Sequence, residues 1–523
     1  MAKASHLGSR HSNRNQRARR RPTEESNPLS AFVKTIHTVD IVRLNDDGDG
    51  VGLIDDVTVF VRGALPGENV RVEVTEAHRR HLIAQVVEWL GVEGHRSSGV
   101  EVLRLSGIEE QRTSRVEEQR SSDEQDEVSG DAVTSNSQDI LSLDRVTPLC
   151  GVFEACGGCQ LQHVSYRGQL LHKRSVVVNA LQRIGRFSEF VVQPTIGMDE
   201  PWRYRNQIQV PLKWDEESLS LSQGFFAPGS HTVVQTNSCA LVPEVVEQTM
   251  TLVPKALTEV LGPDAAFVHH LIIRFSVHTG EQMLILGVSR RLRQERELMD
   301  ALMVGSIVSL AMTVQERSTG PVWGKTVEHL AGKRVLTERL GDVEFLISPR
   351  SFFQVNTRQA EVLTKLVQDR AALSGNETIL DAYCGTGTFS LTLARFVKQT
   401  VGIETVVAAV HDARENARVN RIDNARFEVG EVEQLLPEWV RHGQKFDVAV
   451  LDPPRKGCHP DVLRALIDAG IPKIVYVSCN PSTLARDVRL LADEGYQLGE
   501  FQPVDMFPQT SHVECVVAAF KSL

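Results

Sequence analysis

The sequence predicts a multidomain protein that ends in an α/β domain built on a mostly parallel sheet. Its C-terminal third alternates short apolar strands with helical segments, while a stretch near its start carries only short β patterns. A length of 523 residues allows two to four domains. We expect a disordered basic arm, a small β-barrel, a disordered acidic linker or insertion, a central α+β domain and the α/β domain, spanning residues 1–32, 33–92, 93–145, 146–345 and 346–523.

Composition sets the broad class of the protein. With 41% hydrophobic and 24% charged residues, the chain is typical of a soluble globular protein. It has no run of about 18 apolar residues and no apolar segment after its basic start, so we expect neither a membrane helix nor a secretory signal. Eight cysteines in so long a chain fit a reducing compartment better than a disulfide framework. We therefore expect a cytoplasmic protein without disulfides, membrane attachment or an obligate protein partner.

The net charge of −10 is unevenly distributed. The first 22 residues hold seven basic side chains and no acidic one, a pattern that would bind phosphates. An organelle transit peptide is the alternative, because it is also rich in arginine and poor in acids. Residues 109–139 reverse the balance, with ten acids against three arginines and little apolar periodicity, so we interpret them as part of a disordered segment.

Four apolar or alternating runs predict the β-barrel: Val39–Leu44, Val57–Val61, Val70–Val74 and Leu82–Val87. The sequences DDGDGVG and ALPGEN between them are typical of turns. Barrels of this size often bind single-stranded or looped RNA, and the basic run His78–His81 lies between two of the strands.

A cysteine pattern opens the predicted central domain. Cys156 and Cys159 lie three residues apart with two glycines between them, and Cys150 precedes them closely. Such thiolates can share one metal centre, to which Cys239 is a weaker candidate fourth ligand. Spacing alone leaves zinc and an iron–sulfur cluster both open.

From about residue 203 to 346 the chain mixes strands and helices, which predicts an α+β domain without a catalytic constellation. The run Trp202–Asn206 combines aromatic and basic side chains. It could contact RNA, although an ordinary exposed strand gives the same pattern.

A thiol ends one strand of the predicted parallel sheet. Ile474–Val477 reads as a strand buried on both faces, and the sequence SCNP stops it. Ligands bind at the carboxyl edge of such sheets, which makes Cys479 a candidate nucleophile. The alternative is a small buried residue that ends a core strand.

A glycine-rich turn predicts the cofactor site. The segment TILDAYCGTGTFSLTLA runs from a strand through Asp381, Tyr383, Gly385 and Gly387 into a helix. Glu404 ends the next strand, where a carboxylate can accept both hydroxyls of a ribose. Because the full three-glycine dinucleotide fingerprint is absent, the pattern disfavours NAD and favours a nucleoside cofactor such as S-adenosylmethionine. Glu404 could instead be an acid at a helix N-terminus.

Two further strand ends complete the predicted site. Asp452 is followed by Pro453 and Pro454, which fix the backbone and build a rigid wall suited to a flat base. The Pro-Pro pair could also be a simple strand stop. Glu514 begins the last apolar run of a hairpin-like C-terminal segment. An acidic side chain is unusual at such a position, which makes Glu514 a candidate site residue.

The motifs together resemble the RNA uracil-C5 methyltransferase family, closest to its TRAM-domain, iron–sulfur members that act on 23S rRNA. SFFQVN, DAYCGTGTFS, GIE, DPPRKG, VSCNP and DMFPQTSHVE follow one another in that family's order, and residues 33–92 resemble a TRAM domain through the GALPGE turn. The resemblance implies a TRAM/OB-like barrel and a Rossmann-like methyltransferase domain. It also implies the following roles: Cys479 as nucleophile, Glu514 as base, Gln354, Tyr383, Glu404 and Asp452 as S-adenosylmethionine contacts, and Cys150, Cys156, Cys159 and Cys239 as ligands of a [4Fe-4S] cluster.

The chemistry of uracil is consistent with these roles. Carbon 5 is a poor nucleophile until a thiolate adds at carbon 6, after which a base must remove the carbon-5 proton. A stacked uridine hides its ring, so we expect a loop uridine of 23S rRNA as substrate. A transfer RNA uridine is the alternative substrate. An inactive RNA-binding protein and an amino-group methyltransferase are the alternative functions.

Overall fold

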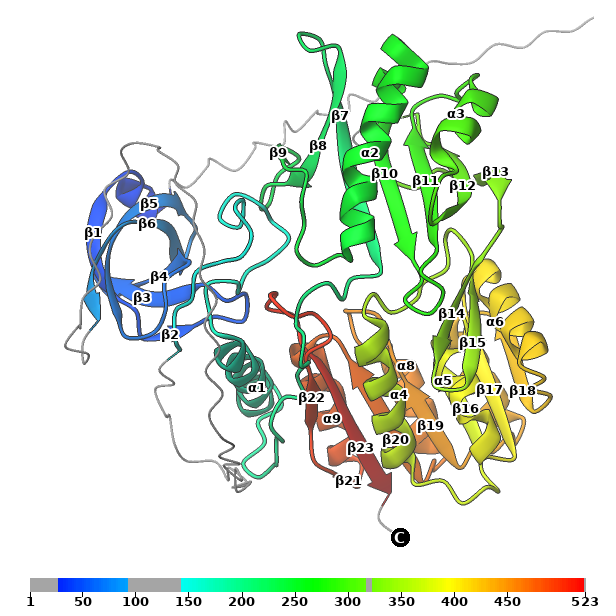
Figure 1. Cartoon of the computed structure of the whole chain (residues 1–523). Coiled ribbons are helices and arrows are strands. Elements are labelled where there is room, and N and C mark those ends of the chain that lie inside the picture. The colour runs from blue at the N-terminus through cyan, green and yellow to red at the C-terminus, as the bar shows by residue number, and fades with distance from the viewer. Residues whose placement is uncertain (1–26, 93–142, 317–321, 522–523) are drawn as a thin grey trace, which may run out of the picture.

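The computed structural model describes residues 27–92, 143–316 and 322–521 (Figure 1). Residues 1–26 of the predicted basic arm and most of the predicted acidic segment lie outside these residues. The expectation of disorder is wrong for the end of the arm, because Pro28–Phe32 form a 3₁₀ helix whose Leu29 and Phe32 pack on an apolar core. It is also wrong at Arg145, whose side chain donates to Glu68 at 2.7 Å. In the part of the chain that is described, no helix is long and apolar enough to cross a membrane.

The N-terminal unit is a small barrel of six strands with a short 3₁₀ helix (Figure 1). Its elements are η1 (Pro28–Phe32), β1 (Ile36–Asp40), β2 (Arg43–Leu44), β3 (Gly50–Ile54), β4 (Val57–Arg62), β5 (Glu68–Ala77) and β6 (His81–Val92). The strands follow the order β1-β5-β6-β4-β3-β2 around a core of valine, leucine and isoleucine side chains. The predicted barrel is confirmed.

Strand β3 occupies a stretch for which the sequence pattern predicted only a turn. A Cβ atom at Gly52 would lie 2.2 Å from Val39 Cγ1 and 2.7 Å from the Asp40 carbonyl oxygen. At Gly50 it would lie 2.8 Å from the Ala64 carbonyl oxygen. Glycine is therefore required here because another segment of the barrel crosses closely over β3, and these glycines gave the appearance of a turn.

A seven-stranded sheet forms the central unit, in the order β13-β12-β11-β10-β7-β8-β9. In chain order its elements are β7 (Gln207–Asp215), β8 (Ser220–Phe226), β9 (Val233–Gln235), α2 (Glu244–Leu261), η2 (Gly262–Phe267), β10 (Val268–Phe275), β11 (Gln282–Val288), α3 (Glu295–Leu302), β12 (Ile307–Val314) and β13 (Val327–Gly332). Helices α2 and α3 cover one face of this sheet (Figure 1). The expected α+β architecture is present.

The C-terminal unit is an eight-stranded sheet in the order β18-β17-β16-β19-β20-β23-β21, with β22 paired to β23. Its elements are α4 (Thr357–Ala371), β16 (Thr378–Ala382), α5 (Thr388–Leu393), η3 (Ala394–Phe396), β17 (Gln399–Glu404), α6 (Val407–Val419), β18 (Ala425–Val429), α7 (Val432–Arg441), β19 (Val448–Leu451), α8 (Pro460–Asp468), β20 (Lys473–Ser478), α9 (Pro481–Asp493), β21 (Tyr496–Leu498), β22 (Gln502–Val504) and β23 (Glu514–Lys521). The first five strands are parallel and β23 is antiparallel to β20. The strand order reverses between β16 and β19, so the topological switch point lies there.

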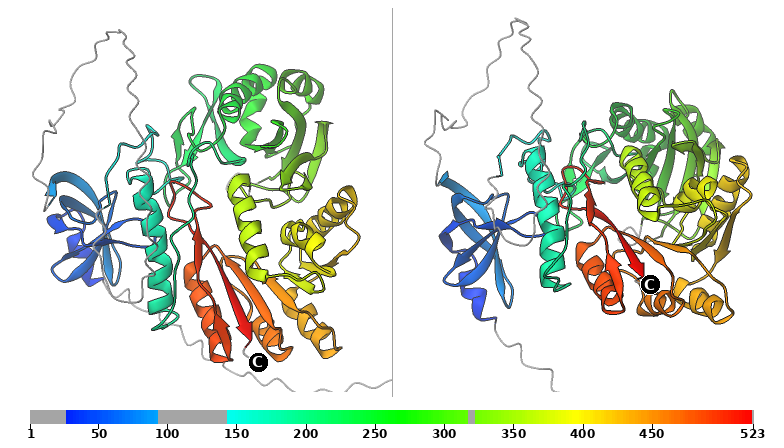
Figure 2. Two further views of the ribbon diagram at one scale, coloured as in Figure 1. Left: turned by 60° about the horizontal axis from the view of Figure 1, so that its bottom comes forward. Right: turned by 90° about the horizontal axis from the view of Figure 1, so that it is seen from below.

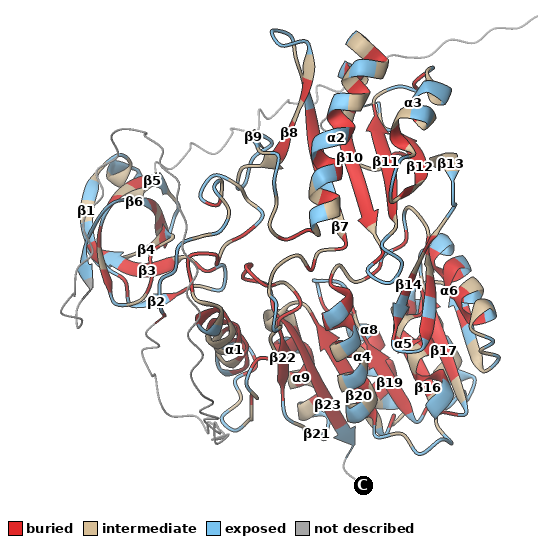
Figure 3. Cartoon of the chain, viewed as in Figure 1, coloured by how far each residue is buried: buried red, intermediate tan, exposed pale blue. Residues whose placement is uncertain are grey.

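Two connecting elements join these units. The hairpin of β14 (Leu336–Leu340) and β15 (Val343–Ile347) packs against α4 and α6 of the C-terminal unit. Helix α1 (Tyr166–Arg183), which follows the cysteine-rich loop, packs against α9 and lies between the barrel and the C-terminal sheet (Figure 2). Its apolar residues belong to the same core as β16 and β20, and the central strands of both large sheets are buried (Figure 3).

Candidate active site and cysteine cavity

The candidate nucleophile lies where β20 ends. The last residues of β20 are buried, and Cys479 is half-buried immediately after them. The Asn480 amide donates to Ser478 Oγ at 3.1 Å, and Asn480 Oδ1 caps α9 by accepting from the Ser482 amide at 3.0 Å. The thiol thus sits on a short, fixed turn between a core strand and a helix N-terminus.

Glu514 lies beside this turn because of the register between β20 and β23. Ser478 pairs with Cys515 in this antiparallel ladder, which brings the next position, Cys479, opposite Glu514. The Glu514 side chain is only 4% exposed. Burial, and secondarily the nearby charge of Asp452, raise the pKa of Glu514 well above its usual range. The predicted nucleophile and base are therefore brought together at one edge of the sheet.

The same charges act on the thiol. Burial raises the pKa of Cys479 to about 11, with further contributions from Glu514 and Asp452, whereas the Arg455 guanidinium opposes the rise. Arg455 Nη2 lies 2.8 Å from His512 Nδ1. The carbonyl oxygen of Arg455 accepts a hydrogen bond from Asn480 Nδ2 at 3.0 Å. This bond connects the loop after β19 to the turn that carries the thiol.

The candidate cofactor edge lies at the switch point. Asp381 Oδ2 accepts from the Ser390 amide at 2.8 Å and from its hydroxyl at 2.6 Å, while Asp381 Oδ1 has no partner among the described residues. Burial raises the pKa of Asp381 to about 7. The Gly385 amide donates to Glu404 Oε2 at 3.2 Å. A Cβ atom added at Gly385 would meet nothing within 4 Å, so open space adjoins this turn.

The three other predicted cofactor contacts differ in orientation. Asp452 directly follows β19, the strand that pairs with β16, so it lies at the switch point with Asp381. Burial and then Asp381 raise the pKa of Asp452 to about 7. The Tyr383 side chain turns toward Cys458, in the loop before α8, and its backbone has φ +72°. The carbonyl oxygen of Gln354 accepts a hydrogen bond of 2.8 Å from Asn206 Nδ2 of the central unit. A contact of Tyr383 to a cofactor would thus come from its backbone.

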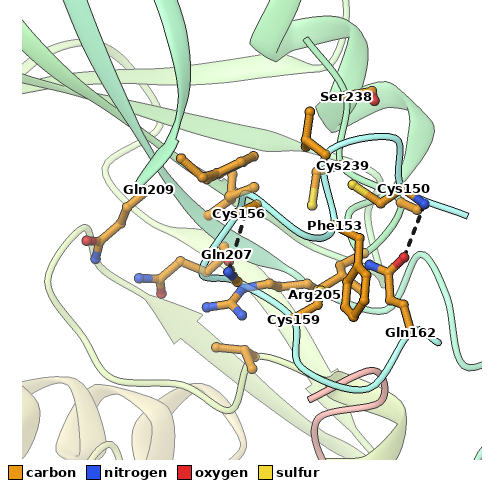
Figure 4. A pocket seen from close by; sticks show the side chains of 17 residues that line it. Cys150, Phe153, Cys156, Cys159, Gln162, Arg205, Gln207, Gln209, Ser238 and Cys239 are labelled. Atoms are coloured by element: carbon orange, nitrogen blue, oxygen red, sulfur yellow. Dashed lines mark hydrogen bonds between the residues drawn. The ribbon is translucent and has the colours of Figure 1, made fainter. Parts of the chain in front are cut away.

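The four cysteines predicted as metal ligands line one cavity of about 310 Å³ (Figure 4). The loop before α1 supplies Cys150, Cys156 and Cys159, and the loop after β9 supplies Cys239. The Cys150 amide donates to Gln162 Oε1 at 3.1 Å. Burial, with smaller contributions from the three other thiols, raises the pKa of Cys159 to about 12, and a hydrogen bond with Gln162 opposes the rise. Among the described residues no group of three or more His, Cys, Asp or Glu side chains is arranged to hold a single metal ion.

The run Trp202–Asn206, considered above as an RNA-contacting surface, is largely internal. Tyr204 is 5% exposed and its hydroxyl donates to the Pro508 carbonyl oxygen at 3.0 Å. Asn206 is 7% exposed, and Arg203 bonds to Glu247 at 2.7 Å. The RNA-contact interpretation is therefore wrong for Tyr204 and Asn206, because both are used to join the central unit to the C-terminal unit.

Sequence reasoning missed the polar residues that hold the loop in front of Glu514. Lys173 and Gln169 of α1 are buried and form hydrogen bonds to this loop. Gln509, the partner of Gln169 within the loop, is buried as well. Helix α1 carries polar and charged residues along its whole length, so nothing in the sequence distinguishes its buried polar residues from its solvent-facing ones.

Comparisons with known proteins show the family of this chain. Residues 333–522 match the family model of tRNA (uracil-5-)-methyltransferases, and residues 31–87 match that of the TRAM domain. An uncharacterized RNA methyltransferase of Halalkalibacterium halodurans is 36% identical over 91% of this chain and 95% of its own length. One from Listeria innocua is 35% identical over the same shares.

One solved structure resembles almost the whole chain. It is the Pyrococcus abyssi tRNA (uracil-54, C5)-methyltransferase in complex with S-adenosyl-L-homocysteine, which is 26% identical, covers 92% of this chain and all of its own, and gives a TM-score of 0.64. This chain thus belongs to the S-adenosylmethionine-dependent RNA uracil-5-methyltransferase family, with a TRAM domain at its N-terminal end.

Proposed function

We propose that the protein methylates carbon 5 of a uridine by covalent addition of Cys479 to carbon 6, with Glu514 as the base. The observation that carries this proposal is the pairing of β20 with β23, which sets a half-buried thiol opposite a buried carboxyl. A carboxyl with a raised pKa is a stronger base once it has lost its proton, which suits the removal of a proton from carbon.

Each proposed residue has a defined step. The Cys479 thiolate forms the S–C6 bond, and the C5=C6 electron pair moves toward carbon 5 and oxygen 4. S-adenosylmethionine, when bound, would supply the methyl group to carbon 5, with its S–CH3 bond broken and S-adenosyl-L-homocysteine as the leaving group. The Glu514 carboxylate then accepts the carbon-5 proton, the C5=C6 bond re-forms, and the S–C6 bond breaks to return the thiolate. Arg455, the positive side chain that opposes the pKa rise of Cys479, favours the thiolate that starts the cycle.

The switch-point residues fit a nucleoside cofactor. Open space adjoins Gly385. Asp381, which is buried in the strand that precedes this turn, has an unpartnered carboxylate oxygen. We propose that Glu404 and Asp452 contact the ribose or base of S-adenosylmethionine, with Gln354 and the Tyr383 backbone at the edges of the same site. Titration of the cofactor against Glu404→Gln should show weaker binding, with the covalent thiol chemistry left intact.

We propose that the cysteine cavity holds a [4Fe-4S] cluster bound by Cys150, Cys156, Cys159 and Cys239. All four side chains line the same cavity of about 310 Å³, and cysteine thiolates are the usual ligands of such clusters. A structural zinc ion can use the same four ligands and is the alternative. Protein purified without oxygen should be brown and contain about four iron and four sulfide per chain. Stoichiometric zinc would contradict the proposal.

The proposed substrate is a loop uridine of protein-free 23S rRNA. The TRAM barrel presents His78 and His81, with stacked rings 4.6 Å apart, beside the exposed Arg79 and Arg80. Trp89, which is 52% exposed, lies toward the other end of β6. Barrel and cysteine unit together offer more surface than one small hairpin needs. Transfer RNA is the second candidate, because the solved relative is named as a tRNA methyltransferase. Mapping of tritiated methyl groups on total RNA decides between the two.

The covalent mechanism is tested with 5-fluorouridine RNA, which traps a thiol-addition enzyme as a stable adduct. The unmodified protein should form the adduct, and Cys479→Ala should form none while binding S-adenosylmethionine with unchanged affinity. Cys515→Ala is the matched control, because it removes the neighbouring buried thiol outside the site. Methyl transfer by Cys479→Ala would refute the mechanism. Methylation without an adduct would indicate an amino-group methyltransferase, and neither activity would indicate an RNA-binding protein.

A further inference from the structure

The loop of residues 505–513, between β22 and β23, leads directly into Glu514. Side chains from far earlier in the chain hold it. Lys173 Nζ donates to the Phe507 carbonyl oxygen at 3.0 Å, and the Tyr204 hydroxyl donates to that of Pro508 at 3.0 Å. The loop that leads into the proposed base is therefore held from outside its own sheet.

The strongest connection is a reciprocal pair of glutamines. Gln169 Nε2 donates to Gln509 Oε1 at 2.9 Å, and the Gln509 amide donates to Gln169 Oε1 at 2.9 Å. The two side chains are 1% and 2% exposed, so water does not compete for these bonds. Gln509 has φ +71°, a conformation that is unfavourable for a residue with a side chain and persists only when its surroundings hold it.

The same glutamine of α1 also holds the loop that carries the cysteines. Gln169 Nε2 lies 3.1 Å from the Leu161 carbonyl oxygen and 3.0 Å from that of Val164. The Gln509 carbonyl oxygen accepts from the amides of Gln160 and Leu161 at 3.1 and 3.0 Å. Gln160 directly follows Cys159, so one hydrogen-bonded unit connects the cysteine cavity with the loop in front of Glu514.

We propose that Gln169 is a positioning residue that couples the cysteine loop to the base, so that a disturbance of the cysteine loop misplaces Glu514. The proposal rests on the proposed role of Glu514. It predicts that loss of the glutamine pair slows proton removal from carbon 5, the step that needs the base, and leaves cofactor binding and thiol addition in place. A misplacement of about 1 Å can lower a rate by about a hundredfold.

The test compares Gln169→Met with Gln182→Met, the same substitution at an exposed position of the same helix. We expect Gln169→Met to lower kcat about tenfold or more, with the KM for S-adenosylmethionine changed less than about twofold. The fraction of protein joined covalently to unmodified RNA at steady state should rise, because addition continues while elimination is slow. Gln182→Met should match the unmodified protein in all three measurements.

Hydrogen exchange provides a readout that does not depend on activity. Amides within residues 509–514 should exchange faster in Gln169→Met, and strand β20 should stay protected. Gln160→Ala is a milder second variant on the cysteine loop itself, since Gln160 is only partly buried and its Oε1 accepts from the Ser511 amide at 3.4 Å. It should produce the same pattern to a smaller extent.

Three results would overturn the coupling: unchanged exchange within residues 509–514, a loss of kcat no larger than in Gln182→Met, or an equal loss of cofactor affinity. Failure of the proposed function looks different. In that case the unmodified protein forms no adduct with 5-fluorouridine RNA, yet the exchange measurement still shows whether Gln169 holds the loop.

Discussion

Lys173 and Asp505 form an ion pair in which both side chains are 0% exposed. The pair joins α1 to the loop in front of Glu514. Replacing Lys173 with Met keeps the length and most of the volume of the side chain, so it leaves the Asp505 carboxylate buried without its counter-charge and opens no cavity. Removal of one partner of a buried pair costs about 3–5 kcal/mol. We expect the free energy of unfolding of Lys173→Met to fall by that amount.

The second half of the experiment removes both charges. Burial lowers the pKa of Lys173 and the attraction of Asp505 opposes this only in part, which means that desolvation of the ammonium outweighs the attraction. The double variant Lys173→Met/Asp505→Asn should therefore recover about 2 kcal/mol or more of the loss in the single variant. Asparagine keeps an acceptor for the neighbouring Tyr166 hydroxyl.

Urea unfolding followed by circular dichroism measures both effects, with the single variant Asp505→Asn completing the cycle. The reasoning is refuted if the two single losses simply add in the double variant, because the two charges would then not depend on each other. A loss below about 1 kcal/mol in Lys173→Met would also refute it, since that is the range of a solvent-exposed pair.

Two further measurements test the site. In the unmodified protein, alkylation of Cys479 should increase with pH toward the thiol pKa of about 11. Glu514→Gln should lower the pH of half-maximal alkylation, because it removes a carboxylate that helps to raise this pKa. An unchanged midpoint would contradict an effect of Glu514 on the thiol. Gly457→Ala should cost about 1–3 kcal/mol of stability. Gly457 has φ +79°, and its new Cβ would lie 2.5 Å from Arg486 Nη2 and 2.6 Å from Asp487 Oδ2; a thermal midpoint equal to that of the unmodified protein would show that the turn relaxes.

The sequence alone determined the local elements and the residues at their ends. Period-two and fully apolar runs predicted β4, β16, β19 and β20, because a strand in a sheet must bury one face or both. It also placed Cys479 and Asp452 at one edge without any long-range information, since the carboxyl ends of parallel strands meet at the same side of a sheet.

Only the tertiary structure decided which distant segments share a core or a hydrogen bond. Helix α1 packs on the C-terminal sheet, and its Gln169 pairs with a residue 340 positions later. Neither this packing nor this hydrogen bond produces a pattern in the sequence, because a buried glutamine or lysine cannot be told from a solvated one by its residue type. The sequence did not predict strand β3 for a related reason. Its glycines are required by the close approach of another segment of the barrel, and not by a local turn. Local pattern reports how a segment folds, whereas the partner of a buried polar group is fixed by the packing of the whole chain.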